Sequence, residues 1–266
     1  MAHPAIVLPL RRAGLVFSAL IVGSLTPDLP YFVFASEFHW AHSWLGVFLF
    51  CLPVALAALW LFHAVLKRPL VALAPEAMRR RIAPADLEFR FGPARRFAWI
   101  VVSLLIGVIS HVLWDGFTHD HGYFVKHWAL LNGPVETYRV MPMYKALQQG
   151  FSALGVAVLA VVTAWWWYRK PIVSEPVGPE MTPRLRWFVI TIVVLLACMT
   201  GAAAGLKVHF GHQWKMSMIK GVIAAISTTC AELLVFSFVW LWYGKQGNDG
   251  QPPDERVQRL EVTRER

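Results

Sequence analysis

The chain has 266 residues, of which 57% are hydrophobic and only 15% are charged, against roughly 25% charged residues in an ordinary soluble domain. This composition excludes a disordered chain, disfavours a soluble globular enzyme and is typical of an integral membrane protein. The formal net charge is +9. Membrane proteins carry an excess of Lys and Arg on their cytoplasmic loops, so the charge does not predict a nucleic-acid partner.

Five apolar runs are long enough to cross a lipid bilayer. Each has 18 to 25 residues, which matches a hydrocarbon core of ~30 Å at 1.5 Å of rise per residue. The runs are 44–66, 97–114, 150–168, 187–206 and 219–243. The sequence therefore predicts an all-α, polytopic helical membrane bundle with five full spans, forming one domain over residues 1–243. The polar residues 244–266 are expected to be a disordered cytoplasmic tail.

A shorter apolar segment, residues 13–25, precedes these spans. Pro27, Asp28 and Pro30 follow it and interrupt a continuous helix. The segment is either a short sixth span or a half-helix at one face of the membrane. If it spans the bilayer, His3 is cytoplasmic; if it is re-entrant, His3 lies outside.

Basic residues predict the orientation of the spans. Loops 67–96 and 169–186, together with the C-terminal tail, carry 17 Lys and Arg, whereas loops 115–149 and 207–218 carry five. The basic side of a membrane protein is the cytoplasmic side. We therefore expect a bacterial inner-membrane protein with a cytoplasmic C-terminus, and we expect the less basic loops and segment 26–43 to share the outer face.

Histidines and aspartates gather on this predicted outer face. The densest group is 110–121, Ser-His-Val-Leu-Trp-Asp-Gly-Phe-Thr-His-Asp-His. His111 and Asp115 are four residues apart on one helix, so they share a face near the outer end of a span. An ionisable pair inside a span is costly and is a functional candidate by default. The alternative is a buried His–Asp hydrogen bond that only holds helices together.

A second group contains Asp28, His39 and His42. Ser43 is a good N-cap for the span that begins at residue 44, so the positive end of that helix faces the group. The alternative is an interfacial belt of His and Trp.

Histidine nitrogens and carboxylate oxygens without thiolates suit Zn²⁺, with Mn²⁺ or Fe²⁺ as alternatives, and the two groups together offer enough ligands for two metal ions. Three side chains are expected to converge on one ion and two more to complete its shell: His42, His111 and Asp115, with Asp28 and either His119 or His121. His209 and His212, in the loop 207–218, are a weaker candidate pair.

Four blocks of sequence resemble an uncharacterised bacterial membrane family, domain of unknown function 4184. They cover roughly residues 1–150 and read His3-Pro-Ala-Ile-Val-Leu-Pro-Leu-Arg-Arg12, Ser18-Ala-Leu-Ile-Val-Gly-Ser-Leu-Thr-Pro-Asp28, His42-Ser-Trp-Leu-Gly46 and Ser110-His-Val-Leu-Trp-Asp-Gly-Phe-Thr-His119. That family is similar to predicted membrane-bound metal-dependent hydrolases. More distantly, the spacing is similar to that of zinc-dependent phospholipases C, which hold a three-metal cluster.

The resemblance implies a set of six metal ligands, with His119 as a competitor for the last place: His3, Asp28, His42, His111, Asp115 and His121. The phospholipases also use their N-terminal amine and a later H-x₃-E pair. This chain starts Met-Ala-His and has no H-x₃-E. One or two metals are therefore expected in place of three.

The leading hypothesis is a metal-dependent hydrolase at the outer membrane–water boundary that acts on a lipid ester or phosphoester. The metal would lower the pKa of a bound water and polarise the scissile group, and His119 or Asp120 would move protons. Arg11 and Arg12 are expected to hold a phosphate if they lie outside.

Two non-enzymatic alternatives remain, a transporter and a protein with a structural metal or haem site. A transporter should show polar residues through the bilayer midplane, where this chain has only Glu232 and His63. A b-type haem needs paired histidines on facing spans without adjacent carboxylates.

Overall fold

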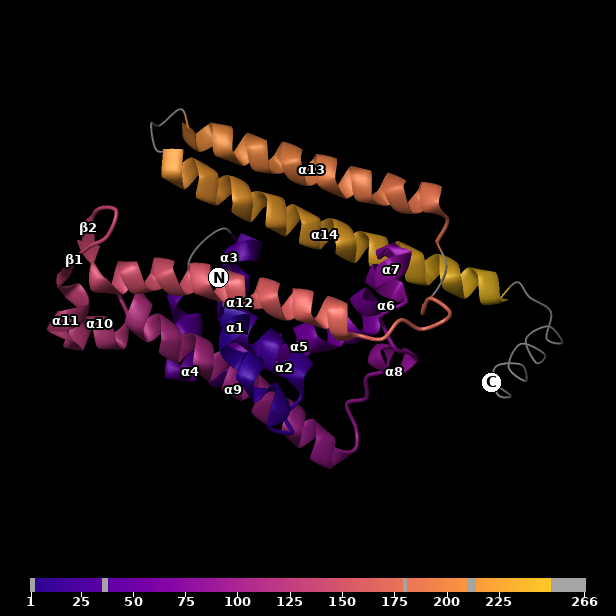
Figure 1. Ribbon diagram of the computed structural model, residues 1–266, viewed down its shortest axis with the longest axis horizontal. Helices are drawn as coiled ribbons and strands as arrows, with labels where there is room; N and C mark the ends of the chain where they lie inside the picture. The colour runs from indigo at the N-terminus through magenta and orange to yellow at the C-terminus, as the bar shows by residue number, and fades with distance from the viewer. Residues whose placement is uncertain (1–2, 35–37, 179–180, 210–213, 250–266) are drawn as a thin grey trace. The chain divides into compact units, whose positions relative to one another are not determined.

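The computed structural model describes residues 3–34, 38–178, 181–209 and 214–249. Six helices in this part of the chain are long and apolar enough to cross a membrane: Phe17–Phe34, Trp44–Leu73, Ala94–His127, Met143–Arg169, Pro183–Lys207 and Met216–Tyr243. The predicted all-α, polytopic membrane bundle is thereby confirmed (Figure 1). His212 and residues 250–266 of the expected tail lie outside the described residues.

The chain forms two compact units, the first from Met1–Phe62 and Arg80–Pro176, the second from His63–Arg79 and Val177–Arg266. The first unit is built of short helical elements, two long helices and one hairpin of strands. In chain order these are α1 (His3–Val7), η1 (Leu8–Arg12), α2 (Phe17–Leu25), η2 (Thr26–Asp28), α3 (Leu29–Phe34), η3 (His39–His42), α4 (Trp44–Gly46), η4 (Val47–Cys51), α5 (Leu52–Leu61), α8 (Pro84–Leu87), α9 (Ala94–Thr118), α10 (Tyr123–His127), α11 (Ala129–Asn132), β1 (Pro134–Glu136), β2 (Val140–Pro142) and α12 (Met143–Arg169). The chain passes to the second unit within the π-helical η5 (Phe62–Leu66).

The N-terminal segment doubles back on itself. His3 begins α1 and Asp28 ends η2, yet their side chains are 4.0 Å apart. Between them, α2 runs parallel to α9. Just before α2 begins, Val16 N–H donates to Ser103 Oγ (2.9 Å). Near the end of α2, the Ser24 backbone lies beside Gly107, which is further along α9. Ser103 precedes Asp115 by about 18 Å of helix at 1.5 Å per residue. The segment 3–28 is therefore a hairpin whose two ends meet.

Two glycines let α2 and α9 cross with their backbones in contact. A Cβ on Gly23 would lie 2.3 Å from the carbonyl oxygen of Leu104, and a Cβ on Gly107 would lie 2.4 Å from that of Leu20. Small residues at such crossings are the usual means of close helix packing in lipid. The apolar core beside the crossing is formed by Ala19, Ala55, Leu59, Ile100 and Leu104.

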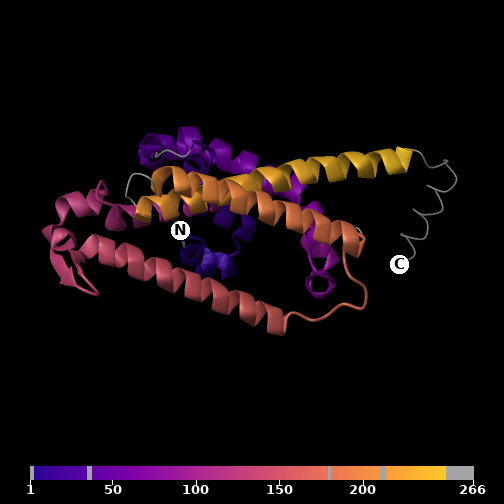
Figure 2. The ribbon, with the colours of Figure 1, turned by 90° about the horizontal axis from the view of Figure 1, so that it is seen from above.

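A small cap joins α9 to α12. The strands β1 and β2 pair antiparallel, with Val135 opposite Met141. Val125, Leu131 and Tyr144 pack together beneath them. Figure 2 shows α10, α11 and the strands gathered at the end of α12 where that helix begins. The cap thereby returns the chain so that the first turns of α12 lie beside the end of α9.

The second unit contains α6 (Lys67–Leu73), α7 (Glu76–Arg79), α13 (Pro183–His209) and α14 (Trp214–Asp249). The last two form an antiparallel pair that lies side by side in both views (Figures 1 and 2). A Cβ on Gly201 or Gly221 would lie 2.9 Å from the carbonyl oxygen of the other glycine, so this pair also packs through small residues.

Candidate metal centre

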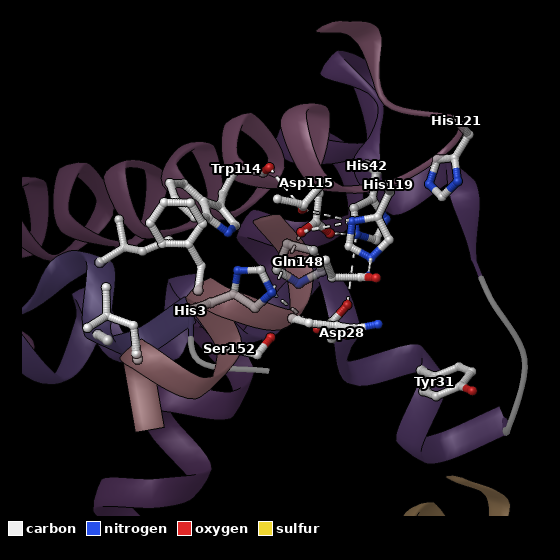
Figure 3. Close-up of a pocket in the computed structure, with 18 of the residues that line it drawn as sticks. His3, Asp28, Tyr31, His42, Trp114, Asp115, His119, His121, Gln148 and Ser152 are labelled. Atoms are coloured by element: carbon white, nitrogen blue, oxygen red, sulfur yellow. Dashed lines mark hydrogen bonds and ion pairs between the residues drawn. The ribbon is translucent and has the colours of Figure 1, made fainter. Parts of the chain in front are cut away.

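Four side chains of the first unit bring one donor atom each within 4.8 Å of one another: Asp28, His42, His111 and Asp115. They come from η2, η3 and α9. His111 Nε2 is 3.2 Å from Asp115 Oδ2 and 3.6 Å from Asp28 Oδ1, while His42 Nε2 is 3.4 Å and 3.9 Å from the same oxygens. Ligands at 2.0–2.2 Å from a tetrahedral ion lie roughly 3.3–3.6 Å apart. The spacing suits a single metal ion, and the side chains of Asp28, His42 and Asp115 point toward a common centre (Figure 3).

His111 is oriented by the backbone of α2. Its Nδ1 lies 2.7 Å from the carbonyl oxygen of Ser24, so Nδ1–H donates there and Nε2 faces the two aspartates. The His111 side chain is 0% exposed, and Nε2 has no hydrogen-bond partner within the described residues. A ring N–H bonded to a carbonyl while the other nitrogen faces the centre is the arrangement typical of metal-ligating histidines.

His42 is held by the turn that precedes α4. Ser43 caps this helix, as its residue type predicts: its Oγ accepts from Gly46 N–H (3.0 Å) and donates to the Trp40 carbonyl (2.7 Å). A Cβ on Gly46 would lie 1.9 Å from that same carbonyl oxygen. The glycine therefore allows η3 to fold tightly against α4, which directs His42 toward the two aspartates.

His3 joins the same site. Its ring stacks on that of His111, with centroids 3.7 Å apart and planes 21° apart, and its Nε2 is 3.6 Å from Asp115 Oδ1. Burial lowers the pKa of His3 to about 3. The His3 imidazole is therefore neutral and retains a lone pair for a metal.

His119 contacts Asp115 and lies beside the four-donor group. Its Nδ1 is 3.4 Å from Asp115 Oδ1 and 3.2 Å from Thr118 Oγ1. Its Nε2 is 2.9 Å from Gln148 Nε2, which belongs to the second turn of α12. Sequence reasoning did not find Gln148, because no local pattern connects it to a histidine 29 positions earlier.

His121 and Asp120 pair with each other away from that group. His121 Nδ1 is 3.0 Å from Asp120 Oδ1, and the Asp120 side chain is 77% exposed. The His121 ring packs edge-on against His39 at 5.0 Å, and both histidines line the cavity described below. The four-donor group therefore does not contain His121, although the sequence made it a candidate for the same shell.

Arg11 lies far from the donors. Its guanidinium is 5.6 Å from the ring centroid of Trp165, near the end of α12 that is remote from Gln148. The hairpin that brings His3 to the site carries Arg11 and Arg12 to its opposite end. The expectation that these arginines hold a phosphate at the site is therefore wrong for this arrangement.

The donors open into a cavity of about 720 Å³. Its polar lining includes the two aspartates and Gln148. Its apolar lining includes Ile6, Phe32, Phe38, Phe151, Leu154 and Val158. The cavity lining thus combines charged and hydrocarbon side chains.

The fold and the cluster define a polytopic helical membrane protein with a His/Asp site that can hold a metal ion. The chain belongs to the family described as domain of unknown function (DUF4184), whose model matches residues 1–238. Heme A synthase of Methylorubrum populi (strain ATCC BAA-705 / NCIMB 13946 / BJ001) is 25% identical to it over 213 residues, which cover 70% of this chain and 54% of that protein. The chain thus spans about half the length of this curated relative. No solved structure matches.

Proposed function

We propose that this protein is a membrane-embedded, metal-dependent hydrolase that acts on a lipid ester or phosphoester. The observation that carries the proposal is the meeting of four donor atoms within 4.8 Å of one another, among them the buried Nε2 of His111, which has no hydrogen-bond partner within the described residues. A buried polar atom without a hydrogen bond is costly, and a cation at the centre removes that cost. We propose Zn²⁺ as the ion, with Mn²⁺ and Fe²⁺ as alternatives.

The side chains have distinct roles in this proposal. Asp28, His42, His111 and Asp115 hold the ion, which supplies Lewis acidity and a water of lowered pKa. His119 borders both Asp115 and the cavity, so it can take a proton from the attacking water and return it to the leaving group. Asp120 and His121, at the exposed side, exchange that proton with solvent.

The cavity supports an amphiphilic substrate. Its lining includes Asp28, His42 and Asp115 together with apolar side chains of α12 from Phe151 to Val158. A lipid can place its head group beside the donors and a hydrocarbon chain along the apolar side chains of α12. We place the site on the outer face of the bacterial inner membrane, because the loops on the opposite side carry most of the Lys and Arg.

Metal analysis of protein purified in detergent tests the proposal. The native protein should retain at least one equivalent of divalent metal and hydrolyse a lipid ester or phosphoester in mixed micelles. Asp115→Ala should lower the metal content by an order of magnitude or more and abolish turnover. Asp120→Ala should keep the metal, because the Asp120 carboxylate pairs with His121, which lies outside the four-donor group. Equal metal content in the native protein and Asp115→Ala would contradict the proposal.

A haem-binding function is the second candidate, because the similarity to heme A synthase favours it. The geometry does not support it. The rings of His3 and His111 stack at 3.7 Å, which leaves no space for a porphyrin between them. Two carboxylates also lie within 4.0 Å of these histidines. A Soret band in protein purified after expression with added haem would support the haem-binding function over the hydrolase.

A further inference from the structure

The two aspartates of the cluster each turn their two oxygens toward different histidines. Asp115 Oδ2 faces His42 and His111, at 3.4 and 3.2 Å. Asp115 Oδ1 faces His3 and His119 instead, at 3.6 and 3.4 Å. Asp28 divides in the same way. Its Oδ1 lies 3.9 and 3.6 Å from His42 and His111, whereas its Oδ2 lies 4.0 Å from His3.

We propose that the centre holds two divalent ions bridged by the carboxylates of Asp28 and Asp115. The first site is the four-donor group described above. The second site consists of His3 Nε2, His119 Nδ1, Asp28 Oδ2 and Asp115 Oδ1. In this two-metal form His119 is a ligand, and the proton transfer assigned to it above falls to Asp120. This inference rests on the first site of the proposed function and extends it to a two-metal centre, in which two ions clamp the attacking and leaving oxygens.

The second oxygen of Asp115, Oδ1, supports the second site. The Asp115 side chain is 9% exposed, and its Oδ1 has no hydrogen-bond partner in the part of the chain that the structure describes. A metal at the first site would bind Oδ2 and leave Oδ1 facing His3 and His119. The distances from Oδ1 to His3 and His119 match the ligand–ligand spacing of roughly 3.3–3.6 Å around a tetrahedral ion.

Gln148 decides whether His119 can serve as a ligand. In the present arrangement the Gln148 amide nitrogen is 2.9 Å from His119 Nε2, so it donates there and Nδ1 carries the proton. Rotation of the Gln148 amide group by a half-turn exchanges the positions of its NH₂ and C=O groups. His119 Nε2–H then donates to Gln148 Oε1, and the lone pair of Nδ1 faces Asp115 Oδ1. Gln148 is therefore a positioning residue for the second site.

The charge of a two-metal centre narrows the substrate class. Two carboxylates balance one divalent ion, so two ions leave a net charge of about +2 if the imidazoles are neutral. A buried excess of this kind requires an anionic partner. The second ion therefore favours a phosphoester over an uncharged carboxylic ester.

Metal stoichiometry tests the second site. Protein stripped with a chelator is reloaded with Zn²⁺, freed of excess ion and analysed by plasma mass spectrometry. The native protein should hold two ions per chain, and His3→Ala and His119→Ala should each hold one. His127→Ala is the matched control, because that exposed histidine contacts the Tyr123 carbonyl and stacks on the Tyr123 ring, and it should hold two.

A spectroscopic measurement keeps the inference testable if one variant does not fold. Loaded with Mn²⁺, the native protein should give the electron paramagnetic resonance spectrum of two exchange-coupled ions, and each folded single-site variant that of an isolated ion. One ion in both the native protein and His3→Ala would overturn the second site and leave the first intact. No bound ion in the native protein would overturn both the inference and the proposed function.

Discussion

The Nδ1 nitrogen of His111 lies 2.7 Å from the carbonyl oxygen of Ser24, although the two residues are 87 positions apart in the sequence. The contact depends on the crossing of α2 and α9, where Gly23 and Gly107 bring the two backbones together. The orientation of the His111 ring, a proposed metal ligand, therefore depends on how closely α2 and α9 pack. Changes at the crossing should therefore alter metal binding as well as stability.

Gly107→Ala should destabilise the protein and weaken metal binding. The added Cβ would lie 2.4 Å from the carbonyl oxygen of Leu20, so α2 must move away from α9. Overpacking of this kind costs about 1–3 kcal/mol. Gly150→Ala is the matched control, because nothing lies within 4 Å of its Cβ on the helix α12. Thermal unfolding in detergent and Zn²⁺ titration of both variants make the comparison, and identical behaviour would contradict the close crossing.

Gln148→Leu should weaken the second metal ion roughly tenfold or more, since loss of an outer partner of a metal-ligating histidine has effects of that size. The first ion should be unaffected, because its ligands do not contact Gln148. The adjacent Gln149 accepts a hydrogen bond from Tyr138 O–H, so Gln149→Leu serves as the control. Competition with a zinc-sensitive dye measures both affinities. Loss of both ions in Gln148→Leu would show a general structural effect instead.

A phosphate group should bind the centre better than an uncharged ester. Inorganic phosphate is expected to inhibit hydrolysis competitively in the native protein and much less in His3→Ala, because that variant lacks the excess positive charge of the second ion. Steady-state inhibition at several phosphate concentrations measures this difference. Equal inhibition of both proteins would show that phosphate binding does not depend on the second metal ion.

The cap between α9 and α12 should face the outside of the cell. Leu130 is 70% exposed in this cap, and Ala85 is exposed in α8, on the basic loop. In a background without the native cysteines, Leu130→Cys should react with a membrane-impermeant maleimide in intact cells. Ala85→Cys should react only after permeabilisation. The reverse pattern would invert the orientation and place the metal centre at the cytoplasmic face.

Much of this protein follows from local sequence patterns. The apolar runs predicted the long helices because the thickness of a bilayer sets their length. The i,i+4 spacing of His111 and Asp115 predicted a shared face because the α-helix has 3.6 residues per turn. Ser43 predicted the start of the helix at Trp44 because its side chain can satisfy a free backbone N–H. Each of these features depends on neighbours within a few positions.

The tertiary structure decided which of the candidate side chains meet. His3 reaches the site because the N-terminal segment turns back beside α9, and no local pattern predicts that the two ends of this segment meet. The return of α12 places Gln148 beside His119, which borders Asp115. His121 pairs instead with Asp120. The division of each carboxylate between two sets of histidines arises from four separate segments. Their convergence depends on long-range packing of backbones, which residue spacing along the chain does not encode.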